Sequence, residues 1–218
     1  MTDVADLLPA LGVRVTAGDL ELRGVTDDLV VQLADLAARG VHHPDRMPFT
    51  YPWTDTAPGD FGRSFGQYHW RTRAEFSPSS WVLNLAVLHR GEVVGVQGVT
   101  TSDFLVTRTG ETGSWLGLAH QGKGLGTAVR QVMCAFLFDH LDFTEITSGA
   151  FSDNAASLTV SAKVGYVANG TVRHERRGEQ AILTQLLLTP DAFRRGPHAL
   201  EVEGVEAFRR SVGLDAAA

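Results

Sequence analysis

The chain has 218 residues, of which 44% are hydrophobic, so it is long enough to bury a sizeable core. Lysine and arginine number 19 against 25 aspartate and glutamate residues, and the formal net charge is −6. This balance gives no positive field that would gather nucleic acid or an anionic membrane surface, so any bound anion must be held locally. The composition excludes a disordered or strongly basic chain and predicts a globular one.

A single cysteine, Cys134, rules out an internal disulfide and gives no sign of an oxidising compartment. It lies on the apolar face of an expected helix, which favours a structural thiol over a nucleophile. The N-terminus lacks the basic start and the cleavage site of a signal peptide, and no apolar run reaches the roughly 20 residues that span a bilayer. We therefore expect a soluble, cytoplasmic protein.

In the first half of the chain, short β-rich runs alternate with segments of helical periodicity. The runs 11–15 and 20–25 have the composition of short strands, and Thr26 supplies an N-cap oxygen for a helix. A proline-broken, aromatic-rich segment then leads into a second helix. Two further β-rich runs are joined by Arg90-Gly91, which is typical of a hairpin. The elements expected after the first two strands are helix 26–38, helix 60–74, strand 81–89 and strand 92–100.

The second half continues this alternation around a glycine-rich stretch. The tail after Pro190 predicts one or two further helices. No internal repeat and no linker composition interrupts the chain, so we expect one domain over residues 1–218, with about 190–218 as a C-terminal extension. The elements expected between residues 111 and 188 are strand 111–118, helix 127–141, strand 143–148, helix 154–164 and a hairpin of strands 166–174 and 180–188.

The glycine-rich stretch AHQGKGLGTAVR lies between an expected strand and an expected helix. Backbone N–H groups and the helix dipole favour an anion there, such as a phosphate or a pyrophosphate. A Walker A loop is disfavoured because Gly124 stands where the magnesium-binding hydroxyl is needed, and a dinucleotide fingerprint because Thr127 would obstruct close helix packing. The pattern Q/R-x-x-G-x-G/A is matched in full from Gln121 to Gly126. A glycine-softened turn without a ligand is the alternative.

Three motifs in chain order carry a resemblance to a known family. The segment QGKGLG resembles the acyl-coenzyme A pyrophosphate loop of the GNAT superfamily of N-acetyltransferases, in the form found in its RimJ/RimL-type branch. The run ETGSWL is similar to the E-x-G-Y-W-L strand of that branch, with Ser114 in place of the tyrosine. All three motifs fall within 81–188, about half of the chain. The second signature of the branch, N-x-x-S-x-x-V-x-x-K-x-G-F/Y, is matched by Asn154, Ser157, Val160, Lys163 and Gly165-Tyr166.

The resemblance implies an α/β fold of the mixed α+β kind: a mostly antiparallel sheet with a splayed central pair of parallel strands, flanked by helices. It also implies that acyl-coenzyme A is the co-substrate, that no metal takes part, and that the pantetheine arm lies between the parallel strands. Backbone N–H groups near Trp115–Leu118 would then bind the pantetheine and the thioester oxygen. The residues implied to bind the co-substrate are Trp115, Leu116, Gly117, Leu118, Gln121, Gly122, Lys123, Gly124, Leu125, Gly126, Thr127, Asn154 and Ser157.

Acyl transfer to an amine needs an amine without its proton, a polarised thioester carbonyl and a proton for the departing thiolate. By the resemblance, Ser157 protonates the thiolate; relatives outside the branch use a tyrosine four residues later, where this chain has Ser161. Glu111 and Glu175 are the two candidate bases. Ordinary interpretations stand beside these roles: a capping or solvated serine for Ser157, an N-cap for Asn154 and an exposed strand-end charge for Glu111.

Together these implications predict an N-acyltransferase that moves an acetyl or succinyl group from coenzyme A to a primary amine by direct attack in a ternary complex. The chain also resembles actinobacterial members of the branch, including a mycobacterial one thought to use succinyl-coenzyme A. A succinyl carboxylate would need a cationic or hydrogen-bonding partner. The arginines considered for that partner are Arg46, Arg63, Arg71, Arg73 and Arg173.

The acceptor stays open between a protein N-terminus, a lysine side chain and a small amine. No nucleic-acid or membrane partner is expected, and members of the branch often pair through their sheet ends, which keeps a homo-oligomer open. His42 and His43 beside Asp45 do not predict a metal site, because adjacent histidines point apart in an extended chain. The alternative to an enzyme is a regulatory module of the same fold that binds acyl-coenzyme A without turning it over.

Overall fold

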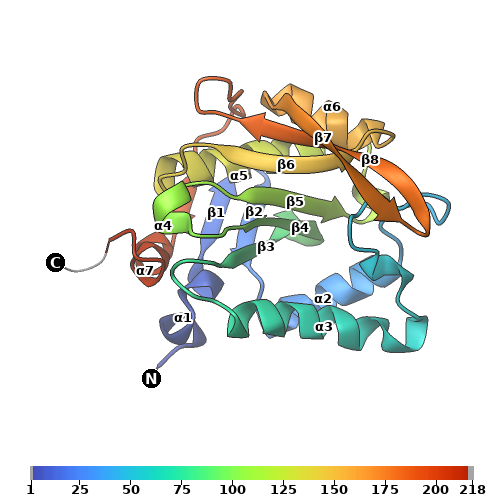
Figure 1. Ribbon diagram of the computed structural model, residues 1–218. Helices are drawn as coiled ribbons and strands as arrows, with labels where there is room; N and C mark the ends of the chain where they lie inside the picture. Colours follow the sequence, from blue (N-terminus) through green and yellow to red (C-terminus); the bar gives the residue numbers. More distant parts are fainter. Residues whose placement is uncertain (1, 216–218) are drawn as a thin grey trace.

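The structure is a computed structural model that describes residues 2–215. Within that range it contains one nine-stranded sheet with the strand order β7-β8-β6-β5-β4-β3-β2-β1-β9 (Figure 1). Neighbouring strands are antiparallel except β5 and β6, which are parallel. This confirms the predicted mixed, mostly antiparallel sheet with one parallel pair. The strands are β1 (Arg14–Ala17), β2 (Leu20–Gly24), β3 (Val82–His89), β4 (Glu92–Thr100), β5 (Glu111–Leu116), β6 (Ile146–Phe151), β7 (Val167–Arg176), β8 (Glu179–Leu188) and β9 (Glu201–Glu203).

Helices cover both faces of the sheet. The helices α2 and α3 lie together on one face, below the sheet in Figure 1, and α5 lies on the other face. The helices are α1 (Val4–Leu7), α2 (Asp27–Ala38), α3 (Pro58–Ala74), α4 (Phe104–Thr107), α5 (Leu125–His140), α6 (Ala155–Val164) and α7 (Val205–Ser211). Three short 3-10 turns accompany them: η1 (Pro9–Gly12), η2 (Trp53–Asp55) and η3 (Leu118–His120).

The helix after the glycine-rich stretch packs as its periodicity predicts. Its apolar side chains at helical spacing join a large cluster with the strands on that face of the sheet. A second, smaller cluster fills the space between the opposite face and the pair α2 and α3. The central strands β3 and β4 contribute to both clusters, so they are buried on both faces. The buried apolar residues of α5 at this spacing include Val129, Val132, Met133, Phe136 and Leu137.

Two strands begin three residues later than predicted. The first was expected from residue 11 and begins at Arg14, because Pro9–Gly12 forms a 3-10 turn. The strand β6 was expected from residue 143 and begins at Ile146, because the Phe143 ring packs 4.7 Å from the Phe104 ring after the end of α5. In both cases the first residues of an apolar run that is typical of a strand lie in a turn, and the strand begins after it.

The C-terminal extension adds one helix, as predicted, and one strand that the sequence did not predict. β9 pairs antiparallel with β1 over three residues, from Thr16↔Glu201 to Arg14↔Glu203. Phe208 of α7 packs 5.2 Å from the ring of Trp81 and is fully buried. The extension therefore forms one edge of the sheet and part of the core beneath it.

Candidate active site

The strand β5 is paired along its whole length on one edge and almost unpaired on the other. Its register with β4 runs from Glu111↔Thr100 to Leu116↔Gly95, whereas its register with β6 holds only at Glu111↔Thr147. We call the unpaired stretch of the two parallel strands the β5–β6 gap, with its closed end at Glu111 and its open end at Leu116. The resemblance implies such a splayed parallel pair.

Side chains bridge the two strands beside the closed end of the gap. The Thr112 hydroxyl donates to the Thr147 carbonyl at 3.2 Å, and the Ser148 hydroxyl donates to the Thr112 carbonyl at 3.0 Å. These hydroxyl bonds add to the one backbone pair of the two strands, Glu111↔Thr147. The strands stay joined at this point while the rest of the gap is left without backbone pairing.

Backbone amides on the unpaired edge of β5 face the gap. The Gly117 N–H donates to a β4 carbonyl at 3.0 Å, and alternate residues of an antiparallel ladder face the same edge, so the Trp115 N–H faces β4 as well. The N–H groups of Ser114 and Leu116 consequently point toward the gap. The Leu118 N–H donates to a carbonyl of the loop after α2, at 3.0 Å. Of the four backbone N–H groups of Trp115–Leu118, that of Leu116 is therefore the one that faces the gap and stays free for a ligand.

The glycine-rich loop ends in a row of backbone amides that are free of hydrogen bonds. Gly122 and Gly124 adopt φ of +72° and +83°, and a Cβ at either would meet no atom within 4 Å, so glycine is needed for its backbone conformation and not for lack of space. Within the described residues, the N–H groups of 122–126 donate to no acceptor, whereas those of Thr127 and Ala128 donate to the Gly124 carbonyl. Five such amides at the start of a 16-residue helix form a site suited to an anion.

Two polar side chains of the loop shape it instead of pointing freely into solvent. The Gln121 amide nitrogen donates to the carbonyls of Val41 and Leu116, at 2.7 and 2.8 Å, and the Lys123 ammonium donates to the Ala119 carbonyl at 2.7 Å. Gln121 therefore ties the loop to the open end of β5. In this conformation the two side chains are already hydrogen-bonded within the chain, and the groups of the loop that are free to bind a ligand are its backbone N–H groups.

The helix α5 begins at Leu125, two residues before the expected start, so Leu125, Gly126 and Thr127 all lie in its first turn. A Cβ at Gly126 would lie 3.5 Å from a methyl group of Val160 on α6. The small residue lets the two helices approach closely. The second motif is brought beside the loop in this way.

The second motif places a free hydroxyl at the start of α6. The Asn154 side-chain oxygen accepts from the Ser157 N–H at 3.1 Å, which confirms the N-cap interpretation of Asn154. Ser157 is half-buried, and its hydroxyl donates to and accepts from no group among residues 2–215. Ser161, one turn later, is buried and its hydroxyl also lacks a partner in that range. Ser157 is the more accessible of the two.

Glu111 lies at the closed end of the gap, on the face that α2 and α3 cover. Glu111, Gly113 and Trp115 share one face of β5, and the Trp115 ring packs 5.6 Å from that of Trp53 in the cluster on that face. The Glu111 carboxylate reaches across the gap to within 3.5 Å of where a Cβ on Gly149 would stand. A side chain at Gly113 would meet nothing within 4 Å, so there is open space beside the carboxylate.

Glu175 lies away from the gap. Its carboxylate accepts from the Gly178 N–H in the turn between β7 and β8. The neighbouring His174 ring lies 6.1 Å from the Phe151 ring, so Glu175 points to the opposite side of β7. Of the two candidate bases, the structure brings only Glu111 to the gap.

A buried polar cluster beneath the closed end of the gap was missed by the sequence analysis. Arg130 of α5 donates to the Ser148 and Ser114 hydroxyls, at 3.3 and 3.1 Å, and to the Gln97 side-chain oxygen at 3.4 Å. The one available signal was an arginine on the apolar face of a helix, three residues before the buried Met133. None of the five arginines considered from the sequence belongs to this cluster.

Two nearby groups that could ionise are held neutral by burial. Cys134 is fully buried, and burial raises the pKa of its thiol to about 11, in keeping with the structural role predicted for it. Tyr166 is 6% exposed and its hydroxyl bonds that of Thr112 at 2.9 Å; burial raises its pKa well above the usual value. Neither side chain ionises near neutral pH.

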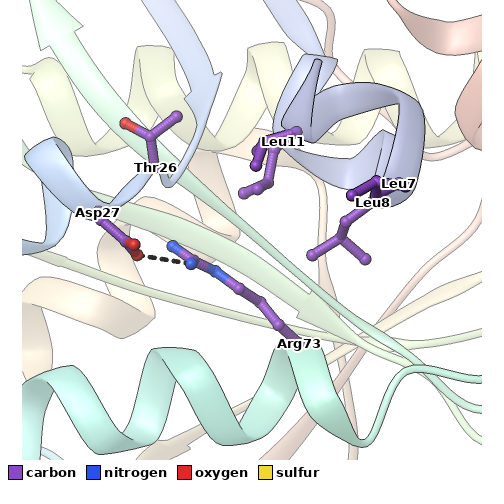
Figure 2. A pocket seen from close by; sticks show the side chains of 7 residues that line it. Leu7, Leu8, Leu11, Thr26, Asp27 and Arg73 are labelled. Carbon is purple, nitrogen blue, oxygen red and sulfur yellow. Dashed lines mark hydrogen bonds and ion pairs between the residues drawn. The ribbon is translucent and has the colours of Figure 1, made fainter. Parts of the chain in front are cut away.

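A separate hollow lies between α1 and the helices α2 and α3, and of the site residues considered from the sequence only Arg73 lines it. Figure 2 shows Arg73 reaching Asp27 there, with Leu7, Leu8 and Leu11 on the other side. The Arg73–Asp27 pair is 2.6 Å long, and Arg63 likewise pairs with Asp60 at 2.7 Å. Two of the arginines considered as partners of a succinyl carboxylate therefore already hold carboxylates of the chain.

Among residues 2–215, no three histidine, cysteine, aspartate or glutamate side chains come together as metal ligands. None of the helices described there is long and apolar enough to cross a membrane.

The chain is similar to known proteins in both sequence and structure. The family described as acetyltransferase (GNAT) domain matches residues 19–167. The structure of Mycobacterium smegmatis RimJ in complex with CoA-disulfide superposes with a TM-score of 0.72 at 17% identity, covering 91% of this chain and 93% of that one. RimL, a ribosomal L7/L12 alpha-N-protein acetyltransferase in complex with coenzyme A, gives a TM-score of 0.66 at 16% identity, covering 80% and 96%. The ribosomal-protein-S5-alanine acetyltransferase of Vibrio fischeri gives 0.61 at 17% identity, covering 81% and 96%.

Proposed function

The chain belongs to the acetyltransferase (GNAT) domain family, and we propose that it is an N-acyltransferase that moves an acyl group from a coenzyme A thioester to a primary amine. One observation carries the proposal: the five unbonded amides of residues 122–126 lie next to the open end of the β5–β6 gap. The amides suit a pyrophosphate. The edge amides of Ser114 and Leu116 suit an extended amide chain, which would bond them as an added strand does.

The two sides of the reaction fall to different residues. The C–N bond forms as the amine attacks the thioester carbonyl in a ternary complex, and the C–S bond breaks. Glu111, beside open space on the α2 and α3 face, takes the proton that the amine loses, directly or through water. The free Ser157 hydroxyl gives a proton to the departing thiolate and regains one from water. Glu175 is the weaker candidate base because its carboxylate already accepts from the turn amide of Gly178.

Donor and acceptor are proposed more broadly than the reaction. Acetyl and succinyl groups are both retained as donors, and a protein N-terminus, a lysine side chain or a small amine as acceptors. Structural neighbours are named as acetyltransferases of ribosomal proteins, and another as a chimera of a spermidine N-acetyltransferase. We treat residues 1–218 as one acyltransferase domain, since β9 and α7 pack into the same sheet and core.

Isothermal titration of the purified protein with acetyl-, succinyl- and free coenzyme A tests the proposal first. We expect saturable binding of all three, and release of free thiol when a panel of protein N-terminal peptides, lysine and polyamines is added with a thioester. A tenfold difference between donors, about 1.4 kcal/mol, is large enough to rank them. Absence of binding to all three would mean that the glycine-rich loop is only a turn, and the proposal would fail.

A non-catalytic module that senses acyl-coenzyme A is the second candidate, because the same loop and gap account for binding without chemistry. It predicts affinity for the thioesters with no thiol release above the uncatalysed rate for any amine. In that case replacing Ser157 by alanine would change neither binding nor any measured rate. Turnover with one amine is enough to reject it.

A further inference from the structure

Arg130 is a buried cation without a counter-ion. Its residue is only 4% exposed, and its three recorded hydrogen bonds, 3.1 to 3.4 Å long, all go to neutral oxygens. Its guanidinium carbon also lies 5.9 Å from the centre of the Tyr166 ring, another neutral group. Among residues 2–215 it takes part in no ion pair.

Other arginines of the chain have the carboxylate partner that Arg130 lacks. Arg195 forms a two-pronged pair with Asp139 on the outer side of α5, and Arg209 contacts both Asp142 and Asp215. Those side chains are more exposed than Arg130 and yet have carboxylate partners. An arginine stays charged under all physiological conditions, so burial cannot be relieved by loss of a proton. A buried charge is ordinarily paired, and a partner for Arg130 is expected from outside the described residues.

The guanidinium lies at the place that an acyl group would reach. Its two terminal nitrogens donate to Ser114 on β5 and Ser148 on β6, so it spans the two strands of the gap on the α5 face. Ser148 follows directly after Thr147, the residue that closes the gap. The anion-binding loop lies at the opposite, open end. A thioester held by its pyrophosphate at the loop and extended along the gap therefore carries its acyl group toward Arg130.

We propose that Arg130 binds the terminal carboxylate of a short dicarboxylic acyl group at the closed end of the gap. The inference rests on the proposed function and names its donor class. Arg130 has five N–H donors and three recorded bonds, so two donors remain for a carboxylate oxygen. Glu111 lies on the other face of β5, which keeps the base from pairing with this cation.

A matched pair of thioesters measures how much the terminal carboxylate contributes to binding. Succinyl- and butyryl-coenzyme A both carry four-carbon acyl groups, and only the first ends in a charge. Titration calorimetry of the wild-type protein is expected to give at least tenfold tighter binding of succinyl-coenzyme A. The Arg130→Met variant, whose apolar side chain fills the same buried space, is expected to lose that ratio while still binding free coenzyme A. Arg130→Lys keeps the charge without the planar fork and is expected to retain part of the ratio.

The control variant is Arg195→Gln, which removes an exposed arginine that pairs with Asp139 of α5 and is expected to leave the succinyl-to-butyryl ratio unchanged. A wild-type ratio below tenfold overturns the assignment even if no Arg130 variant folds. A ratio that persists in folded Arg130→Met also overturns it, and so does an equal loss of affinity for acetyl, butyryl and succinyl thioesters, which is the result for a purely structural cation. If neither free coenzyme A nor any thioester binds the wild-type protein, the proposed function itself fails.

Discussion

The two edges of β5 use the same backbone in opposite ways. Toward β4 the ladder is continuous over six residue pairs, and toward β6 it stops after one. On the paired edge the amides are satisfied within the sheet. On the unpaired edge, amides face a gap that ends in a polar cluster at one side and a glycine-rich loop at the other. The difference separates the part of the sheet that provides stability from the part that offers donors to a ligand.

Polar side chains lie where the backbone ladder between β5 and β6 is broken. A break in a ladder leaves buried donors and acceptors that must be bonded or solvated. Hydroxyls of Thr112 and Ser148 satisfy the carbonyls next to the break, and Gln121 satisfies the Leu116 carbonyl at the open end. The amides of Ser114 and Leu116 have no such substitute in their direction, which fits a gap that a substrate completes.

The largest effect is expected at Ser157, the unbonded hydroxyl in the first turn of α6. Ser157→Ala should lower kcat by a factor of roughly 10² to 10⁴, the range of general acid catalysis, because the thiolate then leaves without a proton donor. Titration calorimetry should show unchanged affinity for free coenzyme A. Steady-state thiol release measures the rate.

Ser161 on the same helix is the matched control for that substitution. Its hydroxyl is buried and unbonded in the described structure, so Ser161→Ala should leave kcat unchanged and raise the free energy of unfolding by about 1 kcal/mol. Equal loss of activity in both variants would show that helix α6, and not the Ser157 hydroxyl, is what matters for the rate.

The next largest expected effect is on stability, and it comes from a histidine of α3, which covers one face of the sheet. His69 of α3 is 3% exposed, and burial lowers its pKa from 6.5 to about 4. The unfolded chain therefore binds this proton at higher pH than the folded one. The stability that the neutral ring contributes is complete above pH 6.5 and is lost as the pH falls through 4. The expected loss is about 2 to 3 kcal/mol between pH 7 and pH 4.

Urea unfolding of the wild type and His69→Phe at half-unit pH steps measures this effect. The variant keeps an aromatic ring beside Phe65, whose ring centroid lies 5.0 Å from that of His69, and cannot titrate. Its unfolding free energy should fall less steeply between pH 6.5 and 4.5 than that of the wild type. The exposed His43 serves as the control, and His43→Phe should keep the wild-type slope.

Replacing the carboxylate at the closed end of the gap should lower turnover by about ten- to a hundredfold at neutral pH. Glu111→Gln removes the proposed base, and high pH should restore part of the rate because more of the amine is then already deprotonated. Glu175→Gln is the comparison, since its carboxylate bonds a turn amide away from the gap. A pH–rate profile that changes for Glu175→Gln and stays the same for Glu111→Gln would reverse the assignment.

Much of the unpaired edge could be predicted from the sequence. Glycines that need positive φ, an asparagine before a helix and a glutamate at a strand start are local signals, and the structure places Gly122, Gly124, Asn154 and Glu111 accordingly. The helix α5 was anticipated because its apolar spacing repeats over four turns. These features could be predicted because they depend on residues that are close together in the sequence.

Other features were beyond the sequence because they depend on distant partners. The strand β9 is three residues long, with a glutamate at each end, and forms only because β1 offers a free edge. Arg130 looks like an ordinary polar interruption of a helix until Ser114 and Ser148 converge on it from two strands. The satisfied amides of Gly117 and Leu118 likewise depend on β4 and on the loop after α2. The hydrophobic periodicity of a helix or a strand, 3.6 or 2 residues, does not indicate which distant residues will pair with it.

The smallest effect, about tenfold in affinity, is expected from a methyl group in the loop, and it distinguishes backbone strain from ligand contact. Gly124 and Gly91 have nearly the same positive φ, +83° and +81°, and a Cβ at either meets no atom within 4 Å. Alanine should therefore cost each variant a similar roughly 1 to 2 kcal/mol of stability. Only Gly124→Ala disturbs the row of free amides, so only it should weaken binding of free coenzyme A, whereas Gly91→Ala in the turn between β3 and β4 should bind as the wild type does. Equal affinities in the two variants, measured by calorimetry beside thermal unfolding, would place the pyrophosphate elsewhere.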